Sequence, residues 1–287
     1  MKIAISGSHG LIGRHLIESL KTSNHQIICI DRLFLSYDKK EKLCSIIDST
    51  DVVINLAGAS IDQKWSSDGK KAILESRIDS TRALVSAINQ LKNKPKIFIS
   101  ASAVGAYETD SICDESKTEY GTNFLADVCS QWEAEAKKVS TDVRLVIPRF
   151  GVVLASDGGA FPKMVHLFQL FLGGKIATGQ QGFSWIHIDD AVTIIEFIIS
   201  TPKAIGIINV TVPQSTDNQM LTNALSSQLR KPSWLSTPRF LLRLILGERE
   251  MLITQGHKIY PGKLYNLGYQ FKFSTIDSAV WDLHHKY

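Results

Sequence analysis

The sequence predicts an α/β fold in which a doubly wound parallel sheet lies between two layers of helices. Three features of the first half carry this prediction. Short apolar runs alternate with longer segments of helical periodicity, the runs are almost continuously apolar rather than alternating, and a three-glycine turn follows the first run. Strands of this kind are buried on both faces, as the strands of a parallel sheet covered by helices are.

The expected elements follow one another in a regular order. The predicted strands are residues 2–6, 27–30, 52–56, 96–100 and 143–147, with a further strand at 205–210. Helices are predicted between them at 11–22, 39–47, 68–91 and 123–138, where apolar residues recur every three or four positions. Paired glycines break the second half into a helix at 160–172 and the stretches 215–229 and 238–246.

Two domains are expected from this order of elements. The first is a sheet domain over residues 1–155 that takes up the chain again at about 185–210. The second is a smaller, mostly helical lobe from residues 156–184 and 211–287, in the place where a substrate would be held.

Composition excludes several kinds of partner. The chain has 287 residues, 21% of them charged, with a net charge of +4, and its basic residues are scattered rather than interleaved with aromatic ones, so no nucleic-acid partner is expected. The apolar runs fall far short of the ~20 residues that a membrane span needs, so no membrane partner is expected either. The four cysteines show no paired spacing for disulfides or a metal site.

These exclusions point to a small-molecule substrate. Met1 runs directly into the first strand and leaves no room for a signal peptide, which predicts a cytoplasmic protein. Whether the protein forms a homodimer is left undecided by the sequence.

The three-glycine turn predicts a Rossmann-type dinucleotide site. Gly7, Gly10 and Gly13 lie between the first strand and the first helix. There the first glycine takes a positive φ, the second lets a pyrophosphate approach, and the third allows the helix to pack on the strand. The first helical N–H groups, at Leu11 and Ile12, then face the phosphates. Three glycines alone also occur in structural turns, but here they follow the first strand of a βαβ unit.

The end of the second predicted strand bears on the choice of cofactor. Asp31 is suited to accept hydrogen bonds from the ribose hydroxyls of NAD and repels a 2′-phosphate, whereas the neighbouring Arg32 could grip that phosphate in NADP. The alternative is that the two residues pair with solvent or with each other.

A series of segments extends the comparison to a known family. They are NLAG at 55–58, ESR at 75–77, SASAVG at 100–105, WE at 132–133, RFGVVL at 149–154, SWIHIDD at 184–190 and GHKIYP at 256–261. In this order they resemble the extended, epimerase-like branch of the short-chain dehydrogenases/reductases over almost the whole chain. More narrowly, they resemble an atypical epimerase family of undefined reaction with a C-terminal domain of unknown function.

This resemblance implies a set of cofactor contacts. It implies NADP, with Arg32 next to the adenosine phosphate, although Asp31 stands where the family commonly has a neutral residue and keeps NAD open. Backbone groups of Leu56, Ala57 and Gly58 would line the adenine and ribose, Arg77 would lie near the cofactor, and Val152 would lie near the nicotinamide. For Leu56 and Val152, packing in the core is the alternative.

Catalysis is where the sequence departs from the resemblance. Working relatives carry a Tyr with a Lys four residues later, but Tyr120 is followed by Phe124, and no tyrosine of this chain has a lysine at that spacing. Ser102, Tyr107 and Tyr120 are the remaining catalytic candidates. Their structural alternatives are a hydrogen bond at a strand end, a loop anchor and a cap at a helix entry, respectively.

Two further matters stay open at this point. His187 and Asp189 could form a catalytic pair, or Asp189 or Asp190 could be the N-cap of a helix while His187 bonds to backbone. The function is then either an NADP-dependent oxidoreductase or epimerase-like enzyme, or a dinucleotide-binding sensor or partner-binding module without turnover.

Overall fold

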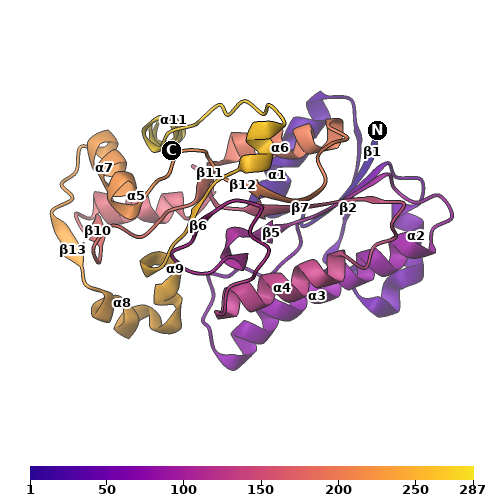
Figure 1. The fold of residues 1–287 in the computed structure, drawn as a ribbon, viewed down its shortest axis with the longest axis horizontal. Helices are drawn as coiled ribbons and strands as arrows, with labels where there is room; N and C mark the ends of the chain where they lie inside the picture. The colour runs from indigo at the N-terminus through magenta and orange to yellow at the C-terminus, as the bar shows by residue number, and fades with distance from the viewer. The chain divides into compact units, whose positions relative to one another are not determined.

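The chain forms two compact units (Figure 1). The computed structural model describes the backbone of residues 1–287 and every side chain except that of Tyr37. The first unit contains Met1–Ala106, Thr122–Arg149 and Val192–Ile208, and the second contains Tyr107–Gly121, Phe150–Ala191 and Asn209–Tyr287.

A mostly parallel sheet is the centre of the first unit. Its strands are β1 (Lys2–Ser6), β2 (Gln26–Ile30), β3 (Val52–Asn55), β4 (Ile97–Ser100), β7 (Arg144–Phe150) and β12 (Gly206–Val210), in the order β12-β7-β4-β3-β1-β2, with β5 (Ser102–Ala103) beside β7. Ile5 of β1 lies opposite Cys29 on one side and Ile54 on the other. The strand order therefore reverses around β1, which is where open α/β sheets bind ligands.

Helices cover both faces of this sheet. They are α1 (Leu11–Thr22), α2 (Lys40–Ile47), α3 (Ser67–Gln90), α4 (Phe124–Ala136) and α6 (Ile188–Ser200). On one face, Leu43 and Leu84 from α2 and α3 share a buried cluster with Phe98 of β4, and α3 lies alongside α4 (Figure 1). On the other face, Ser19 of α1 donates to Glu196 of α6 at 2.6 Å. The predicted doubly wound α/β fold is confirmed.

The second unit combines short strands with most of the remaining helices. The strand groups are β6 (Ile112–Cys113) with β14 (Lys258–Ile259), β10 (Gly174–Ile176) with β13 (Leu235–Thr237), and β8 (Val152–Ala155) with β9 (Gly158–Gly159) and β11 (Trp185–His187). The helices are α5 (Phe161–Gln169), α7 (Asn218–Leu229), α8 (Arg239–Leu246), α9 (Met251–Thr254), α10 (Gly262–Asn266) and α11 (Ile276–Lys286). No helix in the described chain combines the length and apolar character that crossing a bilayer requires.

One long-range pairing draws residues 150–155 into the second unit. β8 runs parallel to β11, with Val152 opposite Trp185 and Leu154 opposite His187. The sequence predicts a sheet domain over residues 1–155, which includes β8. Its hydrogen-bonded neighbour, however, begins more than thirty residues later and lies outside the central sheet.

A buried carboxylate holds the C-terminal segment in the second unit. Asp190 is fully buried, and its carboxylate accepts the N–H groups of Lys272 at 2.9 Å and Phe273 at 2.8 Å and the hydroxyl of Tyr269 at 3.0 Å. Asp189 is more exposed and receives the ammonium of Lys272 at 2.9 Å. Because α6 begins at Ile188, both acids lie within its first turn, where their charge suits the helix dipole, and not at the predicted N-cap position.

Replacing Asp190 by Ala is expected to destabilise the protein strongly. The change leaves two buried N–H groups and a hydroxyl without their acceptor, which should cost about 3 kcal/mol or more of unfolding free energy in a urea titration. Asp189→Ala is the matched control, because its nearest cationic partners, Lys272 and Lys286, are solvent-exposed lysines, and it should cost less than about 1 kcal/mol. Equal losses in the two variants would show that Asp190 does not anchor the tail.

Candidate functional site

The three glycines lie in the turn between β1 and α1, and the space that a side chain would have differs among them. Gly7 has a φ of +72°, and a Cβ there would lie 2.5 Å from the carbonyl oxygen of Leu56. A Cβ on Gly13 would lie 2.3 Å from the carbonyl oxygen of Gly7. At Gly10, by contrast, a Cβ would meet a single atom within 4 Å, the Gly7 oxygen at 3.1 Å. The fold therefore requires glycine at positions 7 and 13, while Gly10 leaves open space that a ligand can enter.

The first turn of α1 faces that open space. Gly10 is the N-cap of α1, with extended backbone angles, and has no side chain with which to accept the N–H groups of the first turn. Leu11 and Ile12, the first two helical residues, are only half-buried. Uncapped N–H groups at the positive end of a helix form a ready site for a phosphate. This cradle fits the pyrophosphate of a dinucleotide.

A buried polar chain supports the loop that follows β3. Ser6 donates to Asn55 Oδ1 at 2.7 Å, and Asn55 Nδ2 donates to Thr81 at 2.8 Å. Beyond Asn55 the backbone turns outward, so that Leu56 and Ala57 are half-buried and Gly58 is exposed. Leu56 is thus neither fully buried nor fully exposed, so core packing stays an alternative and its contact with the cofactor stays a prediction.

Arg77 braces the same loop from α3. Its Nη1 donates to the carbonyl oxygens of Ala59 at 3.0 Å and Ile73 at 2.9 Å, and its guanidinium lies 5.2 Å from the ring centre of Trp132. A Cβ on Gly58 would come within 3.1 Å of this guanidinium. Burial lowers the pKa of Arg77 from its ordinary value. In the described structure Arg77 therefore shapes the loop of Gly58, at the edge of the cradle.

The end of β2 presents both residues that bear on cofactor choice. Asp31 and Arg32 are exposed, and Asp31 is the N-cap of a short 3₁₀ turn, Arg32–Phe34, in which its carboxylate accepts the N–H of Leu33 at 2.8 Å. This contact occupies one carboxylate oxygen and fixes the backbone on which Arg32 is carried. The predicted positions at the strand end are therefore in place.

Ser102 is engaged by a buried ion pair that the sequence did not reveal. Its hydroxyl donates to Glu133 Oε1 at 2.6 Å, and Arg149 grips both oxygens of the same carboxylate at 2.8 and 2.9 Å. Glu133 and Arg149 are each 1% exposed. A carboxylate this deeply buried persists as a charge only with such partners. The Ser102 hydroxyl hydrogen is thereby directed into the protein.

Cys129 is a second neighbour of Ser102 that sequence reasoning missed. It lies one helical turn before Glu133 on α4, is almost fully buried, and contacts the carbonyl oxygen of Ala103 through its sulfur at 3.8 Å. Burial, together with the charge of Glu133, raises the pKa of this thiol to about 11. The thiol is therefore protonated at neutral pH and is no nucleophile.

Tyr107 and Tyr120 both lie in the second unit. Tyr107 is fully buried, and its hydroxyl donates to Asn209 Oδ1 at 2.9 Å, while the N–H of Asn209 donates to Glu115 at 2.8 Å. This is the geometry of a loop anchor. Tyr120 is half-buried, and the cap of α4 is Asn123, whose side chain accepts the N–H groups of residues 125 and 126, so the cap role considered for Tyr120 was wrong.

Val152 stands on β8 with 37% of its surface exposed, and its N–H donates to the carbonyl of Ser184 at 2.8 Å. At this exposure Val152 is not part of the buried core, and its place near the nicotinamide stays a prediction.

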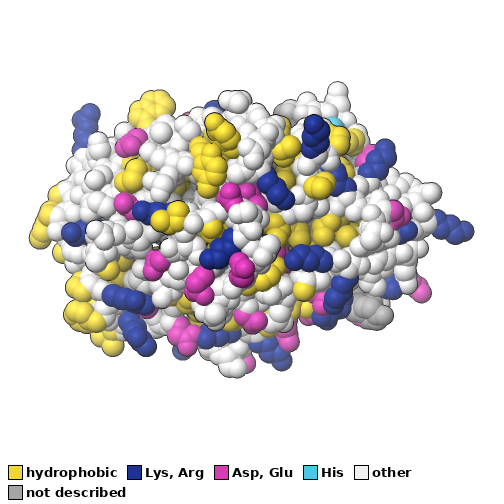
Figure 2. Space-filling model, viewed as in Figure 1, with side chains coloured by type: hydrophobic (Ala, Val, Ile, Leu, Met, Phe, Trp, Pro, Cys, Tyr) yellow, Lys and Arg dark blue, Asp and Glu magenta, His cyan; other side chains and the backbone are white. Residues whose placement is uncertain are grey.

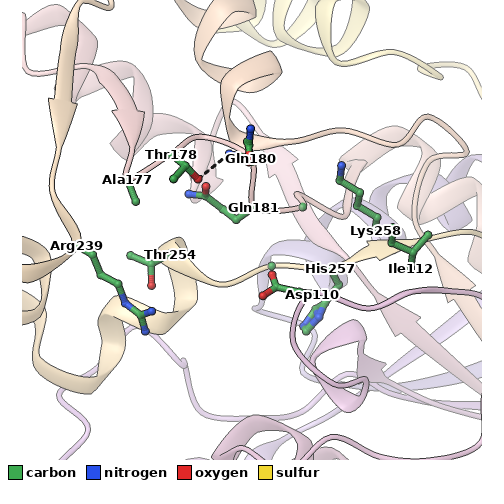
Figure 3. Close-up of a pocket in the computed structure, with 12 residues that line it drawn as sticks. Asp110, Ile112, Ala177, Thr178, Gln180, Gln181, Arg239, Thr254, His257 and Lys258 are labelled. Carbon is green, nitrogen blue, oxygen red and sulfur yellow. Dashed lines mark hydrogen bonds between the residues drawn. The ribbon is translucent and has the colours of Figure 1, made fainter.

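A pocket of about 520 Å³ opens within the second unit (Figure 3). Its polar lining residues come from three stretches of chain and are Asp110, Thr178, Gln180, Gln181, Arg239, Thr254, His257 and Lys258. Arg239 is bound to Glu250 at 2.9 Å, and His257 Nδ1 lies 3.2 Å from the carbonyl oxygen of Glu108. Burial lowers the pKa of His257, so its ring is neutral at pH 7. Apart from the family-like segment at 256–261, no chemical signal for this pocket was found in the sequence.

His187, Asp189 and Asp282 come within 4.8 Å of one another but form an ion-pair cluster. Nδ1 of His187 accepts the N–H of Asp189 at 3.1 Å, which leaves the ring proton on Nε2, 3.2 Å from Asp282. A protonated Nε2 cannot ligate a metal. Lys286 already neutralises Asp282 at 2.8 Å, and burial lowers the pKa of His187 despite the two acids. The backbone contact of His187 expected from the sequence is present.

Comparison with known proteins agrees with this geometry. The model of the NAD dependent epimerase/dehydratase family matches residues 3–211, and a domain of unknown function matches residues 237–283. The chain belongs to the NAD dependent epimerase/dehydratase family. It is 36% identical to an Arabidopsis thaliana protein named epimerase family protein SDR39U1 homolog, chloroplastic, over 98% of this chain and 86% of that one. It is 33% identical to an epimerase family protein of Staphylococcus epidermidis, over 97% of each chain.

Solved structures of related proteins have the same fold. The human epimerase family protein SDR39U1, crystallised with NADPH, superposes with a TM-score of 0.93 at 27% identity over 100% of both chains. A nucleoside-diphosphate sugar epimerase of Corynebacterium glutamicum has a TM-score of 0.78 at 30% identity, over 98% of this chain and 57% of that one. A UDP-glucuronic acid 4-epimerase of Bacillus cereus, solved with NAD, shares the fold at 19% identity with a TM-score of 0.77.

Two glycine variants separate cofactor binding from folding. Gly10→Ala should keep the fold and weaken NADPH binding at least ~tenfold, because its methyl group enters the space of the pyrophosphate. Gly13→Ala should instead lower stability by about 1–3 kcal/mol, because its Cβ overlaps the Gly7 carbonyl. Fluorescence titration and thermal unfolding measure the two effects. A folded Gly10→Ala protein with unaltered NADPH affinity would contradict the assignment.

Proposed function

We propose that the protein is an NADPH-dependent oxidoreductase that acts on a small polar molecule. The observation that carries this proposal is the glycine cradle at the uncapped start of α1, with an arginine exposed at the end of the adjacent strand. The NADPH held by the human relative supports the same cofactor here. A cytoplasmic location, a homodimeric state and the absence of nucleic acid stay predictions.

Each half of the cofactor has residues suited to it in this chain. The N–H groups of Leu11 and Ile12 would bind the pyrophosphate, and the guanidinium of Arg32 would grip the 2′-phosphate in a charge-assisted contact. Backbone groups of residues 56–58 would line the ribose and adenine. When bound, NADPH supplies a hydride to a carbonyl carbon of the substrate, and the protein must deliver one proton to the carbonyl oxygen.

The proton donor has to come from outside the buried network. The hydroxyls of Ser102 and Tyr107 point to Glu133 and Asn209, respectively, and the Cys129 thiol is enclosed. Of the three sequence candidates, Tyr120 is the one with part of its surface exposed, and we assign the proton transfer to it. A tyrosine hydroxyl carries a proton that it can give to a carbonyl oxygen, so Tyr120 can serve as the acid in the direction of reduction.

The pocket of the second unit supports a polar substrate. Amide, hydroxyl and carboxylate groups from Gln181, Thr254 and Asp110 line it together with the ammonium group of Lys258 (Figure 3). Such a lining offers both donors and acceptors, which suits a molecule that carries several oxygen atoms. The Gln181 amide and the Thr254 hydroxyl already donate within the protein, to the carbonyls of Ile176 and Ile253 and to Glu250, respectively. An apolar carbonyl compound would cover the charged groups of Asp110 and Lys258 without giving them a partner, and would therefore bind poorly.

One observation favours a second function, nucleotide binding without turnover. The Tyr–Lys pair of working relatives is absent, because Tyr120 is followed by Phe124 at that spacing. The nearby Ser102 hydroxyl is engaged by the buried Glu133 and Arg149, and the Cys129 thiol has its pKa raised to about 11. A sensor or partner-binding module needs nothing more than the cradle and a surface that changes when the cofactor binds.

Cofactor preference is expected to depend on two adjacent residues. Arg32→Ala should lower the ratio of NADPH to NADH affinity by ~10- to 150-fold, because it removes one charge-assisted contact. Asp31→Asn should raise that ratio, because it removes a repelling charge and keeps an oxygen for the Leu33 N–H. Lys21→Ala, at the far end of α1, is the control. An unchanged ratio in Arg32→Ala would show that the phosphate lies elsewhere.

Turnover is expected to depend on Tyr120 and to have a defined pH profile. On a panel of polar carbonyl compounds, Tyr120→Phe should slow NADPH oxidation by ~10²-fold with the NADPH affinity unchanged. In the reverse direction the rate should rise with pH, because the phenolate is then the active form.

Ser102→Ala and Tyr107→Phe separate structure from chemistry in the same assay. Both variants should lower the unfolding temperature, and both should leave the rate of NADPH oxidation nearly unchanged. Full activity in Tyr120→Phe would remove that residue from the mechanism. NADPH binding without oxidation on any compound of the panel would decide for the second function.

A further inference from the structure

Helix α8 carries an apolar face that is turned to solvent. Its sequence is RFLLRLIL, and Phe240, Leu241, Leu244 and Ile245 recur at the spacing of one helical face. Phe240 is 74% exposed, Leu244 82% and Ile245 68%, and none of the residues of α8 is buried. A surface helix ordinarily turns such a face toward the core. Figure 2 shows these hydrophobic side chains gathered over α8, with basic side chains beside them.

The exposed surface begins before the helix. Trp234, just ahead of β13, is 80% exposed. We call Trp234, Phe240, Leu241, Leu244 and Ile245 the α8 patch. Singly exposed apolar residues are ordinary, but several large ones along one short segment mark an interaction surface.

The segment around the patch also carries most of the excess positive charge of the chain. Residues 230–250 contain Arg230, Lys231, Arg239, Arg243 and Arg249 against Glu248 and Glu250, an excess of three in a protein whose net charge is +4. Arg239 is bound to Glu250 at 2.9 Å. Arg243 lies one turn after Arg239 on α8. The patch is therefore apolar at its centre and basic at its edges.

The apolar centre and basic edges of the α8 patch favour one kind of binding partner over the others. A second copy of the chain would bring two surfaces of the same positive charge together, which disfavours a symmetric contact. A protein partner normally forms a hydrogen bond per 100–200 Å² of interface, but the exposed face of α8 offers carbon atoms alone. A lipid surface needs no hydrogen bonds at its apolar level and attracts basic side chains when its headgroups are anionic.

We propose that the α8 patch docks the protein onto the surface of an anionic lipid membrane. Phe240, Leu244 and Ile245 enter the boundary between headgroups and acyl chains. Trp234 lies at the interface, where tryptophan is favoured. Arg243 reaches the headgroups. The eight residues of α8 lie on the bilayer and do not cross it, so a search for long apolar runs could not find this contact. The proposal revises the expectation that no membrane takes part.

Vesicle sedimentation with the full-length protein tests this proposal. The wild type should sediment with vesicles of phosphatidylcholine mixed with phosphatidylglycerol and should remain in solution with phosphatidylcholine alone. Phe240→Ser/Leu244→Ser should weaken the binding at least ~tenfold, and Arg243→Gln about fivefold. Ile205→Ser/Tyr287→Ser is the matched control, because it removes one aliphatic and one aromatic exposed side chain elsewhere and should bind as the wild type does.

A measurement on the unaltered patch covers the case in which the double variant misfolds. Vesicles with brominated acyl chains should quench the fluorescence of the wild type, and Trp234→Phe should abolish most of the quenching. Equal binding to neutral and anionic vesicles would overturn the proposal. So would absence of quenching, or a wild-type dimer that Phe240→Ser/Leu244→Ser converts to monomers without any binding to vesicles.

Discussion

The structure depends first on the close passage of backbone segments at the carboxyl end of β1. A side chain fits neither at Gly7, which faces the Leu56 carbonyl, nor at Gly13, which faces Gly7 itself. Because Gly7 and Gly13 carry no side chain, α1 can begin directly at the edge of the sheet. The loop after β3 can then pass close to the start of this helix. The N–H groups of the first helical turn are thereby aimed at the space beside Gly10. This packing leaves a space that is suited to a phosphate.

A buried polar cluster near the carboxyl ends of β4 and β7 is the second feature that stabilises this unit. There a buried charge pair, Glu133 with Arg149, takes the hydroxyl of Ser102 as a third partner. Removal of one member of such a pair leaves an uncompensated buried charge, at a typical cost of about 3–5 kcal/mol. The same atoms therefore cannot be rearranged freely for proton transfer.

Local sequence signals sufficed for most of the nucleotide-binding unit. The strand at 2–6 and the helix at 11–22 have the predicted bounds, because apolar periodicity and a glycine turn are local properties. The helix α11 was missed although Ile276, Val280 and Leu283 follow a helical spacing behind a Thr275 cap. That signal was available in the sequence.

Contacts between distant parts of the chain could not be predicted from local sequence signals. The pairing of β8 with β11, the grip of Asp190 on the tail and the partners of Ser102 each join residues that are far apart in sequence. Burial decides their roles, and burial is a property of the folded chain. For the same reason the sequence could place Tyr107 near a loop but could not show that its hydroxyl is held by Asn209.

A crystal structure of the protein soaked with NADPH would locate the bound dinucleotide. We expect pyrophosphate oxygens within hydrogen-bond distance of the N–H groups of Leu11 and Ile12, beside Gly10, with the 2′-phosphate against Arg32. A dinucleotide bound elsewhere on the protein, or a cradle that stays free of it at saturating NADPH, would show that the glycine turn is not the dinucleotide site.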